Sequence, residues 1–173
     1  LILSDLAFEH PWWAMYTLPR QEKKLMRLLT DQKIHFYSPV IRRRYRAPNG
    51  RLRTAFDPLF PNYVFVHGDE LERYQTVCTG CVSKCLEIAD TDALVRDLRQ
   101  IHALIDTGMP IAPESRLEPG QRVRVKNGVF KGFEGTVVRR ENAVRLIIHV
   151  RYMGRGASVA LDDCQLEAID YRA

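Results

Sequence analysis

The feature that most constrains the fold is a run of valines and glycines, GQRVRVKNGVFKGFEGTVV, at residues 120–138. Val123 and Val125 alternate with charged residues, which is the period-two pattern of a half-buried β-strand. Three glycines then interrupt the run before a β-rich segment resumes at Thr136. Glycine serves where the backbone must take a positive φ or pass close to another strand. The stretch therefore predicts strand, glycine loop and strand, as in a small β-barrel.

The residues ahead of this stretch switch repeatedly between strand and helix patterns. Asn49-Gly50 is a strong hairpin signal, so the runs on its two sides are expected to pair antiparallel. Leucines recur at helical spacing after Arg20, opposite a row of basic residues, which predicts an amphipathic helix. This succession predicts an α+β fold in which helices pack on an antiparallel sheet. Strands are expected at 12–18, 35–46, 51–56, 62–66 and 82–88, and helices at 20–32, 71–77 and 91–105.

A proline-rich segment separates the two parts of the chain. Three prolines between positions 110 and 119 mark residues 109–118 as a linker. Beyond it, β-rich runs at 146–150 and 157–161 join the strands around the glycine loop. Five short strands in about 50 residues make a small all-β barrel. The sequence therefore predicts a first domain at 11–108 and a second domain at 119–170.

Charge and composition limit the classes of protein to which the chain can belong. A net charge of +5 and a pI of about 9.2 favour anionic partners. No apolar run approaches the roughly 20 residues of a transmembrane helix. The first residues lack the pattern of a signal peptide, so we expect a cytoplasmic protein. Five scattered histidines, with no nucleophile motif and no phosphate-binding loop, argue against an enzyme, and no cofactor is expected.

Three closely spaced cysteines raise the question of a metal site. Cys78, Cys81 and Cys85 have the spacing C-x2-C-x3-C, whereas a structural zinc site usually takes four ligands as two spaced pairs. The remaining cysteine, Cys164, lies far away in the sequence. We therefore expect the cysteines to be small apolar filler and predict no metal site. A zinc protein is the alternative, which a metal analysis distinguishes.

Six arginines crowd the two arms of the Asn49-Gly50 hairpin, with no acidic residue among them. Their guanidinium groups repel one another on so small a tip, and arginine pairs bidentately with phosphate. We therefore expect this arginine-rich hairpin to lie along nucleic-acid phosphates. A solvated charged hairpin without a ligand is the alternative. The six residues are Arg42, Arg43, Arg44, Arg46, Arg51 and Arg53.

The segment FPNYVFV, at residues 60–66, predicts a strand with two unlike faces. Alternation places Tyr63 and Phe65 on one face and two valines on the other. With Tyr16 from the first strand nearby, these side chains are expected to form an apolar platform. From the alternation alone, a core face is the simpler interpretation of the same residues.

Three segments together resemble the NusG family: WWAMYTLPRQEKKL, PLFPNYVFV and the glycine-loop stretch, which resembles a KOW motif. The resemblance extends from Trp12 to Ile169. It implies an NGN domain with an antiparallel sheet flanked by helices, followed by a small SH3-like KOW barrel. The segment DPLFPNYVFV is more similar to the specialised RfaH-like members than to housekeeping NusG, which tends to have glycine where Asn62 lies. The implied function is that of a transcription elongation and antitermination factor.

The resemblance also implies where a partner would bind the first domain. In the family the NGN domain docks on the clamp helices of bacterial RNA polymerase and bridges the clamp, which suppresses pausing. The matching aromatic positions are Tyr16, Tyr63 and Phe65, with Trp13 as an addition although alternation puts it on the opposite face from Tyr16. A second polymerase contact is expected at Tyr74, Gln75 and Thr76.

Two further surfaces follow from the resemblance. The first helix falls where specialised members read the non-template DNA strand, and Gln21 is the side chain there that is able to read a base. That patch consists of Arg20, Gln21, Lys23, Lys24 and Arg27, and the alternative is an ordinary solvated basic helix face that reads no sequence. In the KOW domain a ribosomal protein or Rho is the implied partner. Its expected contacts are Phe130, Phe133, Met153 and Arg155.

Two alternatives to this interpretation stay open. In specialised members the KOW segment can also fold as a helical hairpin. Here each glycine in the segment disfavours a helix by about 1 kcal/mol relative to alanine, which predicts a barrel. The chain could also be a free-standing RNA-binding module that acts on ribosomal or leader RNA. In the polymerase interpretation, nascent RNA is a possible ligand besides the non-template DNA. We expect a monomer that does not bind a membrane.

Overall fold

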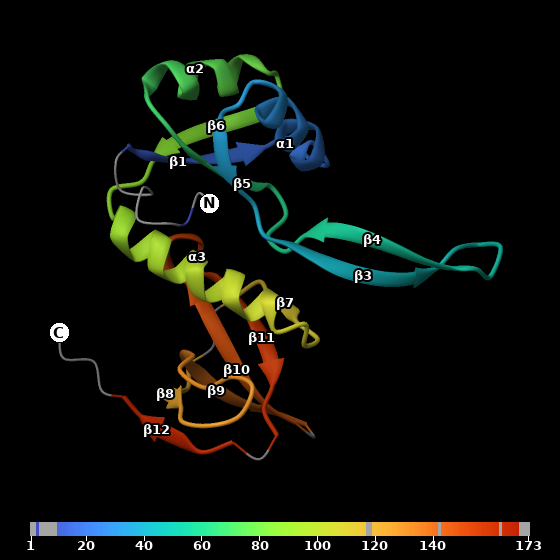
Figure 1. The fold of residues 1–173 in the computed structure, drawn as a ribbon, viewed down its shortest axis with the longest axis vertical. Coiled ribbons are helices and arrows are strands. Elements are labelled where there is room, and N and C mark those ends of the chain that lie inside the picture. The colour runs from blue at the N-terminus through green and yellow to red at the C-terminus, as the bar shows by residue number, and fades with distance from the viewer. Residues whose placement is uncertain (1–2, 4–9, 117–118, 142, 163, 170–173) are drawn as a thin grey trace. The chain divides into compact units, whose positions relative to one another are not determined.

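The computed structural model describes residues 3, 10–116, 119–141, 143–162 and 164–169. The chain divides into two compact units, residues 1–92 and residues 93–173. Figure 1 shows a mixed structure in which strands and helices alternate through the first unit and strands dominate the second. Within the described residues, no helix is both long enough and apolar enough to cross a membrane.

A four-stranded antiparallel sheet forms the centre of the first unit, with the strand order β2-β5-β1-β6. In this sheet Met15 of the central strand β1 pairs with Val64 on one side and with Cys85 on the other. The prediction of strands at 12–18, 62–66 and 82–88 is confirmed within one or two residues. The strands are β1 Trp12–Thr17, β2 His35–Tyr37, β5 Tyr63–His67 and β6 Val82–Glu87.

Two helices, α1 (Glu22–Asp31) and α2 (Glu70–Cys78), belong to this unit. Leu25 and Leu29 are one helical turn apart in α1, and both are fully buried. They join side chains from one face of the sheet in a single apolar cluster. Burying each leucine stabilises the unit by roughly 1.5–3 kcal/mol. The cluster contains Trp13, Met15, Leu25, Leu29, Ile34, Val64, Val66 and Cys81.

The arginine-rich hairpin forms a separate two-stranded sheet, β3 (Val40–Arg46) and β4 (Leu52–Pro58). Figure 1 shows it extending away from the four-stranded sheet. The turn closes where Ala47 N–H donates to Arg51 O at 2.9 Å. The single strand expected at 35–46 is wrong, because the chain leaves β2 before Pro39, which has no N–H to donate to a ladder.

The second unit contains a helix and a six-stranded antiparallel sheet, in the part of it that the structure describes. The strand order is β12-β8-β9-β10-β11-β7, so the five strands expected from the sequence are present and one more is added. Its elements are α3 Thr91–Asp106, β7 Ala112–Glu114, β8 Gln121–Val125, β9 Glu134–Arg140, β10 Ala143–Val150, the 3-10 turn η2 Arg151–Met153, β11 Arg155–Ala160 and β12 Leu166–Ala168.

The glycine loop has the role that its pattern predicts. Gly132 has a φ of 90°, where a side chain would be strained. A Cβ on Gly135 would lie 2.3 Å from the carbonyl oxygen of Ile147, so only glycine lets β9 approach β10 this closely. The segment is therefore built from strands here, as the glycine pattern predicts, and not from a helical hairpin.

A strand that was not predicted lies within the expected linker, residues 109–118. Ala112–Glu114 form β7, which pairs with β11. The Glu114 carboxylate is buried and accepts hydrogen bonds from Arg140 at 2.9 and 3.0 Å and from Ser158. A three-residue strand has almost no periodicity of its own, and these partners lie 26 and 44 residues away. Proline spacing therefore gave no sign of it.

The division between the two units falls between residues 92 and 93, in the first turn of α3, whereas the predicted first domain, 11–108, includes the whole helix. Hydrogen bonds of its side chains tie α3 to β9 and to η2. Asp97 accepts from the backbone N–H of Arg151 at 3.0 Å, and Gln100 accepts from the backbone N–H of Glu134 at 3.0 Å. The predicted domain boundaries at 11–108, 109–118 and 119–170 stay a prediction.

Candidate functional site

An aromatic face lies on one side of the four-stranded sheet, formed by Tyr16, Tyr63 and Phe65. Tyr16 and Tyr63 are cross-strand partners, with ring centroids 4.8 Å apart, and Tyr63 lies 6.4 Å from Phe65. Lys84 from the neighbouring strand places its Nζ 6.0 Å from the centre of the Tyr16 ring. The two tyrosines are half-buried and Phe65 is fully buried. The structure thus brings the three predicted side chains together, with the tyrosines accessible.

Trp13 does not join the aromatic face. Strand alternation sends it to the opposite side of the sheet, where it is 9% exposed and belongs to the apolar cluster. Its indole N–H donates to Gly68 O at 3.1 Å, and the guanidinium of Arg73 lies 5.5 Å from its ring centroid. The prediction that Trp13 contacts a partner is therefore wrong. Trp13 is a core residue, and its indole N–H is hydrogen-bonded within the unit.

Helix α2 presents two of its three predicted contact residues. Asp69 and Glu72 form a reciprocal capping box that fixes where the helix starts. Tyr74 and Gln75 are exposed, but Thr76 is fully buried and donates to Glu72 O at 2.8 Å. Thr76 is therefore corrected to a structural residue, because its position on the helix faces inward.

The basic face of α1 is exposed as expected at Arg20, Lys23, Lys24 and Arg27. Lys23 forms an ion pair of 3.1 Å with Asp57 on β4, which partly neutralises it. Gln21, predicted to read a base, is half-buried, and its Oε1 lies 3.8 Å from the thiol of Cys81. The helix therefore offers phosphate-binding cations more clearly than it offers a base-reading amide.

The six arginines of the hairpin are all exposed, and none of them forms an ion pair with a described residue. The register divides the hairpin into two faces. One face carries Arg42, Arg44 and Arg46 beside Phe56 and Leu52, while the other carries Arg43, Arg53 and Tyr45.

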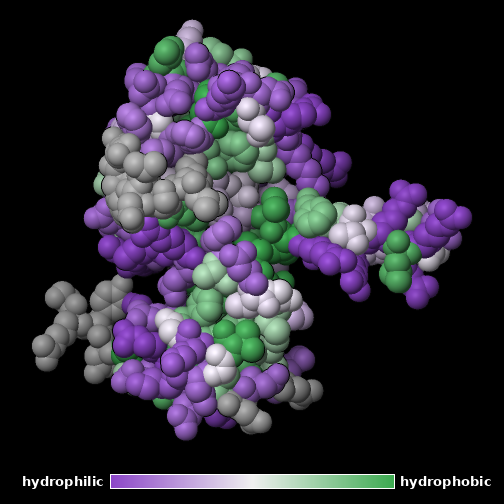
Figure 2. Space-filling view, viewed as in Figure 1, coloured by the Kyte–Doolittle hydropathy of each residue, from purple (hydrophilic) through white to green (hydrophobic). Residues whose placement is uncertain are grey.

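Apolar side chains on this hairpin were not predicted. Phe56 is 59% exposed, Leu52 69% and Tyr45 44%, and Figure 2 shows hydrophobic patches set among hydrophilic ones along the hairpin. Counting residues outward from Asn49-Gly50 as a two-residue turn pairs Phe56 with Arg43, whereas the structure pairs Phe56 with Arg42, because the turn between Ala47 and Arg51 holds three residues. The face on which Phe56 lies was therefore not readable from the sequence. Exposed rings between cations are a suitable surface for stacking unpaired bases.

The predicted partner surface of the second unit is only partly accessible. Phe130 is 4% exposed and lies edge-on to Phe133, with ring centroids 6.2 Å apart. Phe133, Met153 and Arg155 are half-buried. Phe130 is therefore corrected to a core residue that supports Phe133. Val129, at 62% exposed, was missed by sequence reasoning because exposure within a loop has no periodic signal.

The cysteines are unpaired thiols in this structure. Cys81 is part of the apolar cluster, as expected for a small apolar residue, whereas Cys78 is exposed. In the described ranges, no group of three or more histidine, cysteine, aspartate or glutamate side chains is placed to hold a metal ion.

Comparison with known proteins gives the class of this chain. The family model described as "Transcription termination factor nusG" matches residues 10–117. The chain is similar to the transcription termination/antitermination protein NusG of Pseudomonas aeruginosa, with 30% identity over 135 residues, covering 70% of this chain and 72% of that protein. Similarity to NusG of Escherichia coli K12 is 30% over 131 residues, covering 68% and 69%. The chain belongs to the NusG family of transcription termination and antitermination factors, which confirms the family expected from the sequence.

Among solved structures, a chain of the MjSpt4:Spt5 complex in conformation B aligns over 92% of this chain and 99% of its own length. The identity is 16% and the TM-score is 0.30, which is too low to bear on the fold.

Proposed function

We propose that this chain binds bacterial RNA polymerase through the aromatic face and acts as an elongation and antitermination factor. The observation that carries the proposal is the Tyr16–Tyr63 pair, two adjacent rings 4.8 Å apart that are still partly accessible to a partner. Tyrosine is enriched at the energetic centres of interfaces, because it buries a large rigid ring while keeping a polar hydroxyl. The family gives the partner as the clamp helices of the polymerase.

The buried Phe65 supports this face rather than extending it. Its ring lies nearly parallel to that of Tyr63, at an interplanar angle of 25°, and so limits the rotamers open to the tyrosine. A pre-ordered ring loses less entropy when a partner docks on it. Phe65 is therefore a positioning residue in this proposal, and the two tyrosines make the direct contact.

The mechanism needs no chemistry. A factor that bridges the clamp binds the closed, elongating polymerase more tightly than the paused one, and it shifts the population by that difference in affinity. Tyr74 and Gln75 on α2 supply the second contact in the proposal. The exposed cations of α1 and the arginine-rich hairpin add affinity for the non-template strand or the nascent RNA.

The second unit is proposed to bind a further protein, a ribosomal protein or Rho, through Phe133, Met153 and Arg155. Tethering both units in one chain raises the effective concentration of that partner at the polymerase.

A specialised, RfaH-like role is also part of the proposal, and the segment DPLFPNYVFV supports it. The presence of asparagine instead of glycine at position 62 is weak support for this role, because the φ of 69° there suits both residue types.

The test is retention of core RNA polymerase by the full chain. Tyr16→Ala with Tyr63→Ala is expected to weaken binding by roughly thirtyfold for each ring, the effect of about 2 kcal/mol at a hot spot. Tyr152→Ala, which removes an exposed tyrosine from the second unit, is the matched control and is expected to bind as the parent does. Equal binding by the double variant and the control would remove the aromatic face from the proposal.

A free-standing RNA-binding module is the second candidate, and it is favoured by the six exposed arginines of the hairpin, which form no ion pair with a described residue. It predicts tight RNA binding without polymerase, with a steep dependence on salt. Weak RNA binding at physiological salt, together with retention of polymerase, would eliminate this candidate.

A further inference from the structure

One face of the arginine-rich hairpin sorts its side chains into two rows. Directly opposed residues of an antiparallel pair point to the same side of the sheet, and so do residues two apart in one strand. On this face the cations all lie on β3, whereas a ring, a hydroxyl and a leucine lie on β4. The opposed pairs of this two-row face are Arg42 with Phe56, Arg44 with Thr54 and Arg46 with Leu52.

The opposite face of the hairpin lacks this arrangement. There the Tyr45 ring shares β3 with an arginine, and Arg53 lies opposite Tyr45 on β4, so rings and cations are mixed. Asp57 also belongs to that face, and it pairs with Lys23 at 3.1 Å. The two-row face carries no acidic side chain, so nothing within the hairpin offsets its positive charge.

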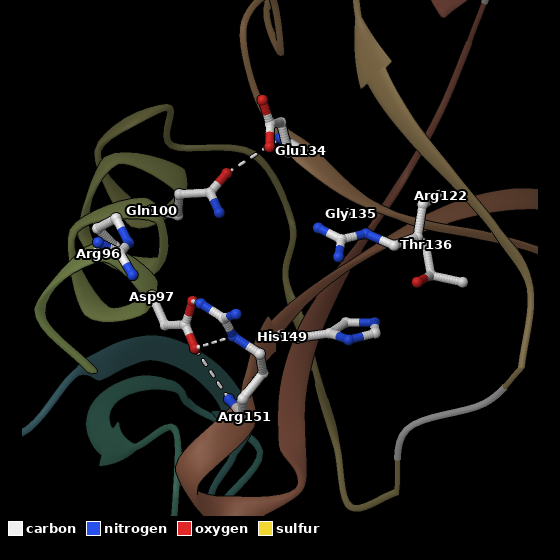
Figure 3. A pocket seen from close by; sticks show the side chains of 9 residues that line it. All are labelled: Arg96, Asp97, Gln100, Arg122, Glu134, Gly135, Thr136, His149 and Arg151. Atoms are coloured by element: carbon white, nitrogen blue, oxygen red, sulfur yellow. Dashed lines mark hydrogen bonds and ion pairs between the residues drawn. The ribbon is translucent and has the colours of Figure 1, made fainter. Parts of the chain in front are cut away.

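The arginines of the two-row face form no ion pair or side-chain hydrogen bond with a described residue. Arginines elsewhere in the chain do have such partners. Asp97 accepts from the Nε of Arg151 at 3.1 Å (Figure 3), and Glu114 accepts from Arg140 at 2.9 Å. Successive arginines of the two-row face are roughly 6.7 Å apart along β3 and repel one another, so an anionic strand laid along them relieves that repulsion.

The β4 row also offers groups that a ligand can use. Phe56 is exposed, and its ring contacts no other ring and no cation among the described residues. Thr54 is exposed as well, and its hydroxyl makes no hydrogen bond within the part of the chain that the structure describes. Figure 2 shows hydrophobic groups beside hydrophilic ones along this hairpin.

We propose that the two-row face binds a single strand of RNA, with its phosphates along the three arginines and an unpaired base stacked on Phe56. Arginine pairs bidentately with phosphate oxygens, and unpaired bases stack on exposed aromatic rings. Neighbouring strands lie roughly 5 Å apart, so one nucleotide spans both rows, with its phosphate over β3 and its base over β4. The inference rests on the nucleic-acid role of the hairpin in the proposed function, and it does not need polymerase.

Two features of the face select the ligand. A duplex keeps the faces of its bases stacked on one another, so Phe56 reaches a base only after unstacking that costs free energy. The sugar of a nucleotide lies between its phosphate and its base. Thr54 lies opposite Arg44, where that sugar comes to rest, and its hydroxyl pairs there with the 2′-OH that DNA lacks.

The experiment measures binding of the full chain, without polymerase, to a short fluorescent RNA that has no self-complementarity, by anisotropy at several salt concentrations. The same RNA annealed to its complement and a DNA strand of the same sequence are the comparison ligands. The single RNA strand should bind roughly tenfold more tightly than the duplex, the effect of one stacked base. It should bind roughly fivefold more tightly than the DNA strand, the effect of one hydrogen bond.

Variants of the two faces locate the binding. Phe56→Leu keeps an apolar side chain but removes the ring, so it should weaken RNA binding roughly tenfold without changing the slope of log affinity against log salt. Phe56→Trp keeps a ring and should bind as the parent does. Tyr45→Leu, which removes the ring of the opposite face, is the matched control and should also bind as the parent does. Thr54→Val should lower the affinity for RNA to that for DNA.

Several results would overturn the proposal. Equal affinity for the single strand and the duplex, or equal weakening by Phe56→Leu and Tyr45→Leu, means that diffuse attraction to a basic hairpin explains the binding. Equal affinity for the RNA and DNA strands, or no saturable binding, overturns it as well. Retention of polymerase is tested separately by the variants of the aromatic face, so failure of that proposal and failure of this one are seen independently.

Discussion

Glu114 decides whether residues 112–114 are linker or sheet, and Glu114→Gln tests this. Its carboxylate accepts two hydrogen bonds from the guanidinium of Arg140 and one from Ser158. Hydrogen bonds to a charged group contribute roughly 1.5–3 kcal/mol each, but the Arg140 side chain is 35% exposed and regains water once its partner is neutral. We therefore expect Glu114→Gln to weaken the pairing of β7 with β11 by about 2 kcal/mol.

The assay is hydrogen exchange at the backbone amides of β7 and β11. A cost of about 2 kcal/mol corresponds to a roughly thirtyfold larger open population, and exchange should accelerate by that factor at these amides. Glu141→Gln, which neutralises an exposed glutamate of the same unit, is the control and should leave exchange unchanged. Unprotected β7 amides in the parent chain, or no acceleration in Glu114→Gln, would refute the reasoning.

The same carboxylate gives a pH dependence with a definite sign. Burial raises the pKa of Glu114, but the hydrogen bonds from Arg140 and Ser158 and the charges of Arg140 and Arg145 outweigh it, and the pKa is lowered. A group whose folded-state pKa is depressed stabilises the fold above its unfolded pKa, and this contribution is lost as pH falls through the folded value. Protection of β7 should therefore decrease in acid below the ordinary glutamate range, and it should not decrease in Glu114→Gln.

Three further predictions concern other parts of the chain. Gly135→Ala should destabilise the second unit by roughly 2–3 kcal/mol in chemical denaturation, because its Cβ meets Ile147 O at 2.3 Å; near-neutral stability would contradict that contact. Asn62→Gly should leave stability almost unchanged, whereas Asn62→Val should lower it by roughly 1–2 kcal/mol, since φ is 69° there; equal effects would argue against the left-handed conformation. Arg44→Gln with Arg46→Gln should reduce the slope of log affinity against log salt for single-stranded nucleic acid by about 1.4, and an unchanged slope would remove these arginines from the interface.

Local periodicity predicted most elements well. The helix expected at 91–105 is α3, Thr91–Asp106, because its apolar residues repeat with the helical period and Gly108 follows its end. The strand expected at 12–18 is β1 for the same kind of reason. The error at 35–46 arose where Pro39 divides one β-rich run between two different sheets.

For the candidate site, alternation correctly placed Tyr63 with Phe65 and put Trp13 on the other face. Exposure was not predictable in the same way. Thr76 and Phe130 were predicted to be contact residues but are buried, since burial depends on what the rest of the chain packs against them.

The sequence by itself determined the order of the elements, the alternation of the strands, the arginine-rich hairpin and membership of the NusG family, because these depend on residues close together in the chain. Only the tertiary structure decided which residues remain accessible and that β7 joins the sheet. Those facts depend on contacts across tens of residues, such as the 44 that separate Glu114 from Ser158. No local pattern encodes such contacts, because they form only when the packed core brings distant segments together.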